Sequence, residues 1–264
     1  MARNGLTLRQ SPLIYHGGRP GFDPVHPASN GIRFSGVASN KDFINLLATP
    51  PLGVATGSSL VVDGLIGQAA KFSGFGHWVK FSGQSTANDQ AATVGCILRL
   101  NTLSGTPTIF ASAATTATGY ALQINSSGAM TFYNNASGIT GASSFSLIAG
   151  TAYFLGGSYN SGVANFVAVN LQNGQIQTSS TTGMSTANTA PDGAYLIGSD
   201  QFGNSSASSI AAIMVSSNLM SIQQLLQWAQ DPWSFWYPNH FDLENILSAP
   251  VIIVPDVLMA QAWM

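Results

Sequence analysis

Charged side chains are scarce in this sequence. Only 7% of its residues are Asp, Glu, Lys or Arg, whereas globular domains typically contain about 25%. Neutral polar residues, or surfaces covered by partners, must therefore keep the chain in solution. All eight basic residues precede position 100, and they are dispersed along the sequence. This pattern does not favour nucleic-acid binding, and we expect no nucleic-acid partner.

Cysteine pairs and long apolar runs are also missing. The single cysteine, Cys96, excludes an internal disulfide framework, and its place in the apolar segment TVGCILRL predicts a small core residue. The N-terminus lacks the apolar run of a secretory signal, and Pro250 and Pro255 interrupt the most apolar C-terminal stretch. We therefore expect a protein that is made in the cytoplasm and has no membrane partner.

The residues that common catalytic mechanisms need are absent or scattered. Glu244 is the one glutamate, so a glycosidase mechanism with two glutamates is impossible, and Asp63, Asp89, Asp192 and Asp200 are isolated in the sequence. None of the four histidines has a second ligand at metal-binding spacing. No P-loop, nucleophile elbow or dinucleotide motif occurs. The sequence predicts a chain that is not an enzyme and has no cofactor.

Calcium is the metal that the composition leaves open. Asp200 with Asn204, and Asp89 with Asn88, could supply oxygen ligands of the kind that Ca²⁺ prefers. The same residue types are common in turns, and too few carboxylates gather at either place to hold the ion firmly. We expect turns here rather than a metal site.

Short apolar segments separated by turn residues fill the chain from Gly31 onward. GYALQINSSGAMTFYNN alternates apolar side chains about a Ser-Ser-Gly turn, and Asn173-Gly174 marks a second hairpin. Gly74 and Gly76 suggest a tight turn between two further strands. Together the segments predict roughly ten to thirteen strands, which is typical of an all-β antiparallel sandwich of the jelly-roll type.

One short helix is predicted at the end of the β region. Apolar residues recur at helical spacing after Ser221, which is a suitable N-cap, and Asp231-Pro232 ends the run. The spaced apolar residues are Ile222, Leu225, Leu226 and Ala229.

An aromatic cluster overlaps the end of this helix and follows it. Its side chains could seal the end of the sandwich, contact a neighbouring subunit or stack on sugar rings. The cluster consists of Trp228, Trp233, Phe235, Trp236 and Tyr237.

Two arms flank the predicted sandwich of residues 31–238. Residues 1–30 contain repeated Pro and Gly, so they predict an extended arm with some apolar docking residues. Residues 239–264 are an apolar arm that either adds to a neighbouring subunit or folds back on its own domain. The docking candidates are Leu13, Ile14, Tyr15 and Phe22 in the first arm, and Val251, Ile252, Ile253, Val254, Val257, Leu258 and Trp263 in the second.

Several segments, in order, resemble the concanavalin-A-like and laminin-G-like jelly rolls. GQAAKFSGFGHWVKF is similar to an early segment of that family, GYALQINSSGAMTFY to its central hairpin, and the stretch from GAYLIGSD to the helix to its closing strands. The helix segment LMSIQQ lacks the acidic residue of the family pattern. The resemblance covers residues 31–238 and implies a sandwich with one terminal helix.

A narrower resemblance concerns the D-P-W-x-x-F ending at Asp231–Phe235, the leader PGFDPVHPAS and the segment FINLL. These look like laminin-G-like proteins of tailed bacteriophages. The resemblance implies a virion surface protein, in head decoration or in a tail or fibre, which forms a homo-oligomer and contacts other virion proteins through its arms. The alternative is a lectin-like module that binds glycans during host attachment.

Overall fold

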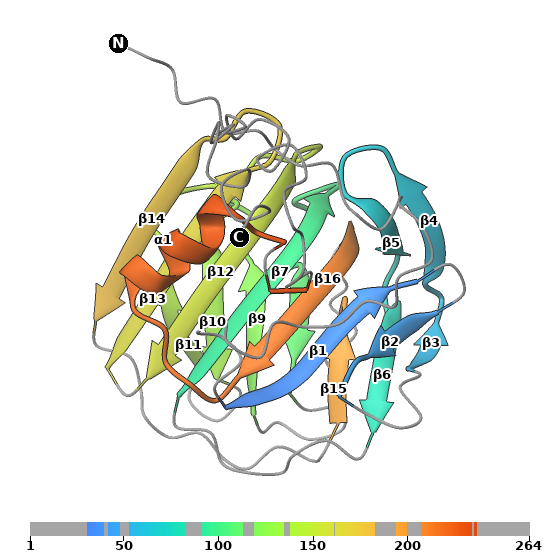
Figure 1. Cartoon of the computed structure of the whole chain (residues 1–264), viewed down its shortest axis with the longest axis horizontal. Helices are drawn as coiled ribbons and strands as arrows, with labels where there is room; N and C mark the ends of the chain where they lie inside the picture. Colours follow the sequence, from blue (N-terminus) through green and yellow to red (C-terminus); the bar gives the residue numbers. More distant parts are fainter. Residues whose placement is uncertain are drawn as a thin grey trace, which may run out of the picture.

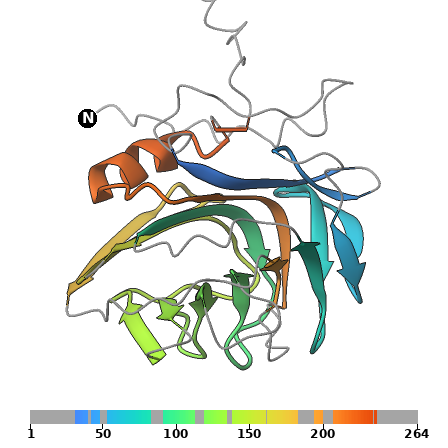
Figure 2. The same cartoon turned by 90° about the horizontal axis from the view of Figure 1, so that it is seen from below.

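Two facing antiparallel sheets and one helix make up the described part of the chain. The computed structural model describes residues 31–39, 42–47, 53–82, 91–112, 119–134, 138–160, 162–182, 194–199, 207–233 and 235–236. Figures 1 and 2 show the two layers, with the helix on the outside of one of them. The predicted all-β sandwich with one short helix is confirmed. Both predicted arms, 1–30 and 239–264, lie outside the described residues.

The larger sheet has nine strands. Its main path runs β14-β13-β12-β7-β16-β1-β2, with β5 paired to β16 and β4 paired to β5. Its strands are β1 (Ile32–Ala38), β2 (Phe43–Asn45), β4 (Ser59–Asp63), β5 (Gly67–Phe72), β7 (Ala92–Leu100), β12 (Ala152–Asn160), β13 (Val163–Asn170), β14 (Ile176–Thr182) and β16 (Ser208–Ser216).

The smaller sheet has seven strands in the order β11-β10-β9-β8-β15-β6-β3. The two sheets together have 16 described strands, more than the predicted ten to thirteen. β2 and β3 contribute to the excess, because they have three residues each and are too short to show a period in the sequence. The strands of this sheet are β3 (Val54–Thr56), β6 (Trp78–Ser82), β8 (Thr108–Ala111), β9 (Tyr120–Ile124), β10 (Met130–Asn134), β11 (Gly138–Ala142) and β15 (Ala194–Ile197).

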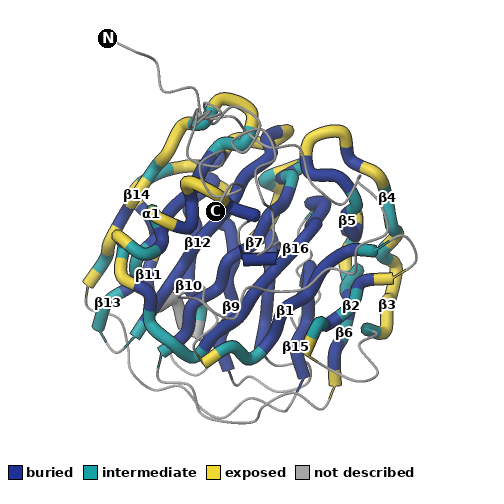
Figure 3. Tube along the Cα trace, viewed as in Figure 1, coloured by how far each residue is buried: buried dark blue, intermediate teal, exposed yellow. Residues whose placement is uncertain are grey.

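The main hydrophobic core lies between the two sheets. Both predicted hairpins are confirmed: β9 pairs with β10, and β13 pairs with β14. Their alternate residues meet across the core, where Phe132 of β10 stacks on Phe166 of β13 with ring centroids 5.7 Å apart. Figure 3 shows the buried central strands and the exposed turns at the rim.

The predicted tight turn at Gly74 and Gly76 joins two strands that do not pair. β5 pairs with β4 and β16 of the larger sheet, whereas β6 pairs with β3 and β15 of the smaller one. The connection carries the chain from one layer to the other, because each strand finds its partners elsewhere in the sequence. Apolar periodicity identifies a strand but not its neighbours.

Helix α1 (Ile222–Gln230) begins at the predicted N-cap. Ser221 Oγ accepts a hydrogen bond from Gln224 N at 3.3 Å, and Gln224 Oε1 accepts one from Ser221 N at 2.9 Å. This reciprocal capping box satisfies two helix-end donors. At the other end Asp231 N donates to Trp228 O. The amphipathic helix lies on the outer face of the larger sheet, over β12 and β13 (Figure 1).

A pair of glycines in the sheet receives the helix. Gly95 of β7 and Gly156 of β12 are cross-strand partners. A Cβ at Gly95 would overlap the Trp228 ring, and a Cβ at Gly156 would lie 3.2 Å from Leu225 Cδ2. Trp228 also packs edge-on against Phe154, with centroids 4.9 Å apart, and its Nε1 donates to Pro232 O at 3.2 Å. The two glycines therefore form a trough in which the helix sits.

Buried hydroxyls fix the loop that leads into the helix. Thr93 Oγ1 donates to Asn218 O at 2.6 Å and accepts from Met220 N at 3.1 Å. Ser158 Oγ donates to Met220 O at 2.6 Å. Because an unpaired buried backbone group is costly, these bonds set the position of the loop on β7 and β12.

Substitution of Gly95 by Ala should lower the free energy of unfolding by about 1–3 kcal/mol, because the added methyl group must displace Trp228. Urea denaturation of the full chain measures the change. Gly64→Ala is the matched control: a Cβ there meets no atom within 4 Å, so its effect should stay within about 0.5 kcal/mol. A Gly95→Ala variant as stable as the control would contradict the trough.

Candidate functional site

A cleft opens where the edges of the two sheets approach each other. Its volume is about 230 Å³, and it is lined by residues of β2 to β6 and their connections. The lining residues are Asp42, Phe43, Gly53, Ala55, Ser58, Ser59, Leu60, Ala70 and Val79.

Strand pairing in both sheets shapes the walls of the cleft. Ala55 of β3 lies opposite Val79 of β6 in the smaller sheet, and Leu60 of β4 lies opposite Ala70 of β5 in the larger one. Cross-strand partners share a face of the sheet. The two pairs thus present apolar surfaces from opposite layers, and Phe43 of β2 lies between these layers.

Polar groups stand at the rim of this apolar cleft. Asp42 is exposed, and its backbone is held by Ser39: Ser39 N and Ser39 Oγ donate to Asp42 O at 2.7 and 2.8 Å, and Asp42 N donates to Ser39 Oγ at 3.1 Å. Ser58 and Ser59 also line the cleft, just before and at the start of β4. The site combines an apolar wall with one carboxylate and neutral polar groups, and no basic residue is among its lining residues.

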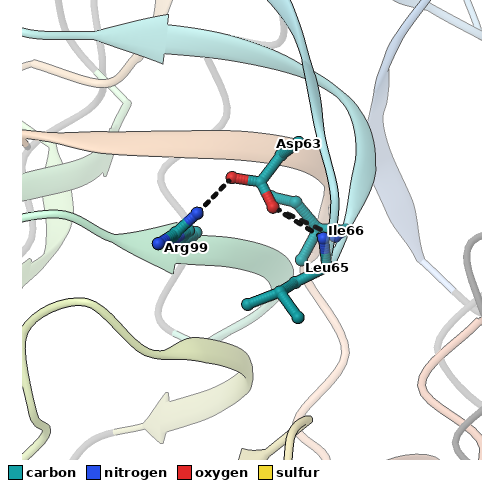
Figure 4. A network of polar contacts seen from close by, with 4 residues as sticks. All are labelled: Asp63, Leu65, Ile66 and Arg99. Atoms are coloured by element: carbon teal, nitrogen blue, oxygen red, sulfur yellow. Dashed lines mark hydrogen bonds and ion pairs between the residues drawn. The ribbon is translucent and has the colours of Figure 1, made fainter.

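An ion pair pins the hairpin that forms one wall. Asp63, at the end of β4, lies 3.2 Å from Arg99 Nη1 of β7 through its Oδ2 atom. Its Oδ1 atom accepts from Leu65 N at 2.8 Å and from Ile66 N at 3.4 Å (Figure 4). One carboxylate thus closes the β4–β5 turn and ties it to a central strand. This contact positions the hairpin, while its cleft-lining residues Ser59, Leu60 and Ala70 lie at its other end.

Asp63→Ala should lower the free energy of unfolding by about 1–3 kcal/mol, because it leaves two backbone donors and a guanidinium without their acceptor. Arg99→Met keeps the aliphatic stem and the turn bonds, so its effect should be smaller. Hydrogen exchange of the β4 amides should be faster in Asp63→Ala than in the wild type. Faster exchange confined to these amides would show that the loss of stability lies in the hairpin. Equal effects of the two substitutions on unfolding would contradict this division of roles.

The described members of the aromatic cluster are buried in the fold. Trp228, Phe235 and Trp236 are fully buried, and Trp233 is 6% exposed. Trp236 packs on Trp228, Trp233 and Phe235 with ring centroids 5.2–6.2 Å apart. These side chains cover the outer apolar face of the larger sheet together with α1. Trp233, Phe235 and Trp236, which were candidates for a subunit contact, are thus buried within the fold and not on its surface. They shield the outer apolar face of the larger sheet from water.

The remaining sequence-predicted site residues lie outside the described residues. They are Asp89, Asn88, Asp200 and Asn204 of the calcium candidates, Tyr237, and the docking residues of both arms. Among the described residues, no three His, Cys, Asp or Glu side chains gather as a metal site would require. No helix in this part of the chain is long and apolar enough to span a membrane.

The prediction that Cys96 is a core residue is confirmed. Its side chain is fully buried in β7, between the two sheets. Burial raises the pKa of the thiol far above its usual range, and a backbone hydrogen bond at Leu155 only partly offsets this effect. Because the thiolate is the reactive form, Cys96 is unsuited to nucleophilic chemistry in the folded chain.

A thiol-specific alkylating reagent should leave Cys96 unmodified in the native protein at pH 8 and modify it fully in denaturant. Intact-mass spectrometry after timed quenching measures both reactions. Stoichiometric labelling of the native chain without unfolding would show that the thiol is accessible.

Sequence reasoning did not identify the cleft. Asp42 and Ser58 have no partner at a recognisable spacing, and the segment FINLL, which contains Phe43, carries a family resemblance but no sign of a binding site. The walls come from both layers, so only the three-dimensional fold brings them together. The isolated Pro-Pro-Leu-Gly sequence before β3 is a signal for a chain reversal, but it does not indicate a binding site.

No protein-family model matches the chain, and no curated protein matches it either. Solved structures do show the same fold. A Trypanosoma rangeli sialidase superposes with a TM-score of 0.54 at 13% identity, covering 80% of this chain and 36% of the sialidase. The binding domain of botulinum neurotoxin serotype D gives 0.53 at 14% identity, covering 76% of this chain and 51% of that domain.

The receptor-binding domain of botulinum neurotoxin type G is a further match, with a TM-score of 0.52 at 9% identity and the same coverage of 76% and 51%. The chain thus spans about a third of the sialidase and half of the neurotoxin domains. At identities this low, the superpositions show a shared β-sandwich fold and nothing finer.

The prediction that the chain is not an enzyme is wrong on this comparison, because chains that share its fold are sialidases. The missing pair of glutamates was one ground for the prediction. Most glycosidases use two Asp or Glu residues, but sialidases use a tyrosine nucleophile. A single glutamate therefore does not exclude glycosidase chemistry.

Proposed function

We propose that the chain is a lectin-like domain that binds a carbohydrate in the cleft between β2 and β6. The observation that carries the proposal is the composition of this cleft: an apolar wall with Phe43 and a carboxylate, Asp42, at the rim. Sugar rings have apolar C–H faces and polar hydroxyl edges, so they need both kinds of surface. The receptor-binding neurotoxin domains with the same fold support this class of function.

The size and charge of the cleft limit the range of sugars that it would bind. About 230 Å³ is below the 300–1,000 Å³ common for drug-sized ligands, which favours a single terminal sugar residue. Asp42 would accept hydrogen bonds from ring hydroxyls. With a carboxylate and no basic side chain among the lining residues, neutral or amino sugars are favoured over sugars that carry an acid.

The biological setting stays a prediction from the sequence resemblance. In a bacteriophage virion such a domain would attach the particle to host glycans, while segments outside the described residues would bind the domain to its neighbours. Head decoration is the structural role that the same resemblance implies.

Ala55→Phe should abolish sugar binding, because the larger side chain fills the cleft from the exposed strand β3. A glycan array identifies the sugar, and isothermal titration of the full chain measures the loss, which should exceed tenfold in Kd. Thr56→Phe is the matched control: it changes the next residue of the same exposed strand, on the opposite face of the sheet.

Equal binding by wild type and Ala55→Phe would place the site elsewhere. An array without saturable binding, repeated at millimolar concentrations of free monosaccharides, would overturn the proposal. Circular dichroism of both variants confirms that the fold is kept.

A further inference from the structure

The edge strand β14 of the larger sheet has none of the features that usually prevent an edge strand from pairing with another chain. β14 (Ile176–Thr182) pairs with β13 along seven residues without a bulge, and within the described part of the chain no strand pairs with its other side. Natural edge strands are usually shielded by lysine, proline, a bulge or short length. β14 has none of these: its sequence is IQTSSTT.

The other described edges differ from β14. β2 and β3 have three residues each, so they offer few backbone groups to a partner. β11 has five residues, and an irregularity interrupts its pairing with β10. β4 ends in Asp63, whose carboxylate is engaged in the turn. An added strand would therefore gain the most backbone hydrogen bonds at β14.

The side chains of β14 suit a second copy of the same strand. Thr178, Ser180 and Thr182 are exposed on one face, and no residue of the strand carries a charge. An antiparallel pair about a two-fold axis at Ser179 would place Thr178 opposite Ser180 of the partner, and Ile176 opposite Thr182. Cross-strand hydroxyl pairs of this kind are favourable, and like charges that would oppose self-pairing are absent.

The neighbouring surface is equally neutral. Helix α1 lies over β13, beside β14 (Figure 1), and none of its nine residues is charged. Two copies related by the same axis would bring their α1 helices toward one another without electrostatic repulsion. A closed two-fold contact also leaves no free edge for further growth at this strand.

Ser179 keeps β14 in place for such a contact. Its side chain is buried, and its Oγ accepts from Ser144 N at 2.9 Å, in the segment that follows β11 of the other sheet. The hydrogen bond to Ser144 N and the pairing with β13 thus hold β14 in an extended conformation, with its other edge exposed to a partner strand. From these observations we propose that the chain dimerises through antiparallel pairing of β14 with β14 of a second copy, which joins the two larger sheets into one.

Sedimentation velocity of the full chain over a concentration series tests the pairing. The wild type should form a dimer, and Thr178→Lys combined with Ser180→Lys should weaken it about tenfold or more, because the lysines of the two copies face each other. Ser73→Lys combined with Ser126→Lys is the control with the same charge change. Both control residues are exposed and lie outside the β14 edge, so the dimer should persist.

A second measurement does not depend on the effect of charge. Ile176→Cys combined with Thr182→Cys should give a disulfide-linked dimer on mild oxidation, whereas the two cysteines of one chain are about 20 Å apart and cannot pair. The buried Cys96 should not interfere. A monomeric wild type, a dimer unaffected by the two lysines, or a dimer that the cysteines fail to cross-link would each overturn the proposed pairing.

Discussion

The seating of helix α1 on the glycine pair, with Trp228 over Gly95 and Leu225 over Gly156, is the constraint on which the rest of the larger sheet depends. The central strands β7, β12 and β16 are buried on both faces, so the outer face needs a cover as much as the inner one does. Helix α1 provides it, and Trp228 can lie close to the backbone only because β7 has no Cβ at Gly95. Burial on both faces explains why these strands are nearly continuous apolar runs, a pattern more usual in parallel sheets.

Local features of the fold were predictable from the sequence because their causes are local. Ser221 and Gln224 form a capping box within four residues, and the β9–β10 turn is closed by Asn125, whose Oδ1 accepts from Ser127 N and Ala129 N. The assignment of strands to layers was not predictable in the same way. β5 and β6 are separated by five residues, yet they lie in different sheets, and each has one partner far along the chain, β16 for β5 and β15 for β6.

The trough and the cleft could not be predicted from the sequence, because both are formed by residues that are far apart along the chain. A glycine inside the apolar strand ATVGCILRL is a sign of close approach, but nothing in the sequence indicates that Trp228 is the approaching residue. The sequence left a core, a subunit interface and a sugar site open for the aromatic cluster, and the burial of Trp233 and Trp236 is seen only in the folded chain. Ala55 of the smaller sheet and Leu60 of the larger one line the same cleft because the edges of the two sheets lie close together there.

The scarcity of charge links these observations. In place of ion-pair networks, hydroxyl groups of Thr93, Ser158 and Ser179 bond to backbone groups of distant segments and hold the helix loop and the two layers together. Such bonds need no counter-charge, and they stabilise the fold at any salt concentration because screening acts on charges. The same neutrality leaves the edge of β14 without the repulsion that usually keeps edge strands apart. Hydrogen bonds between uncharged groups therefore hold the sheets and the helix loop together, and the same lack of charge leaves the edge of β14 open to pairing.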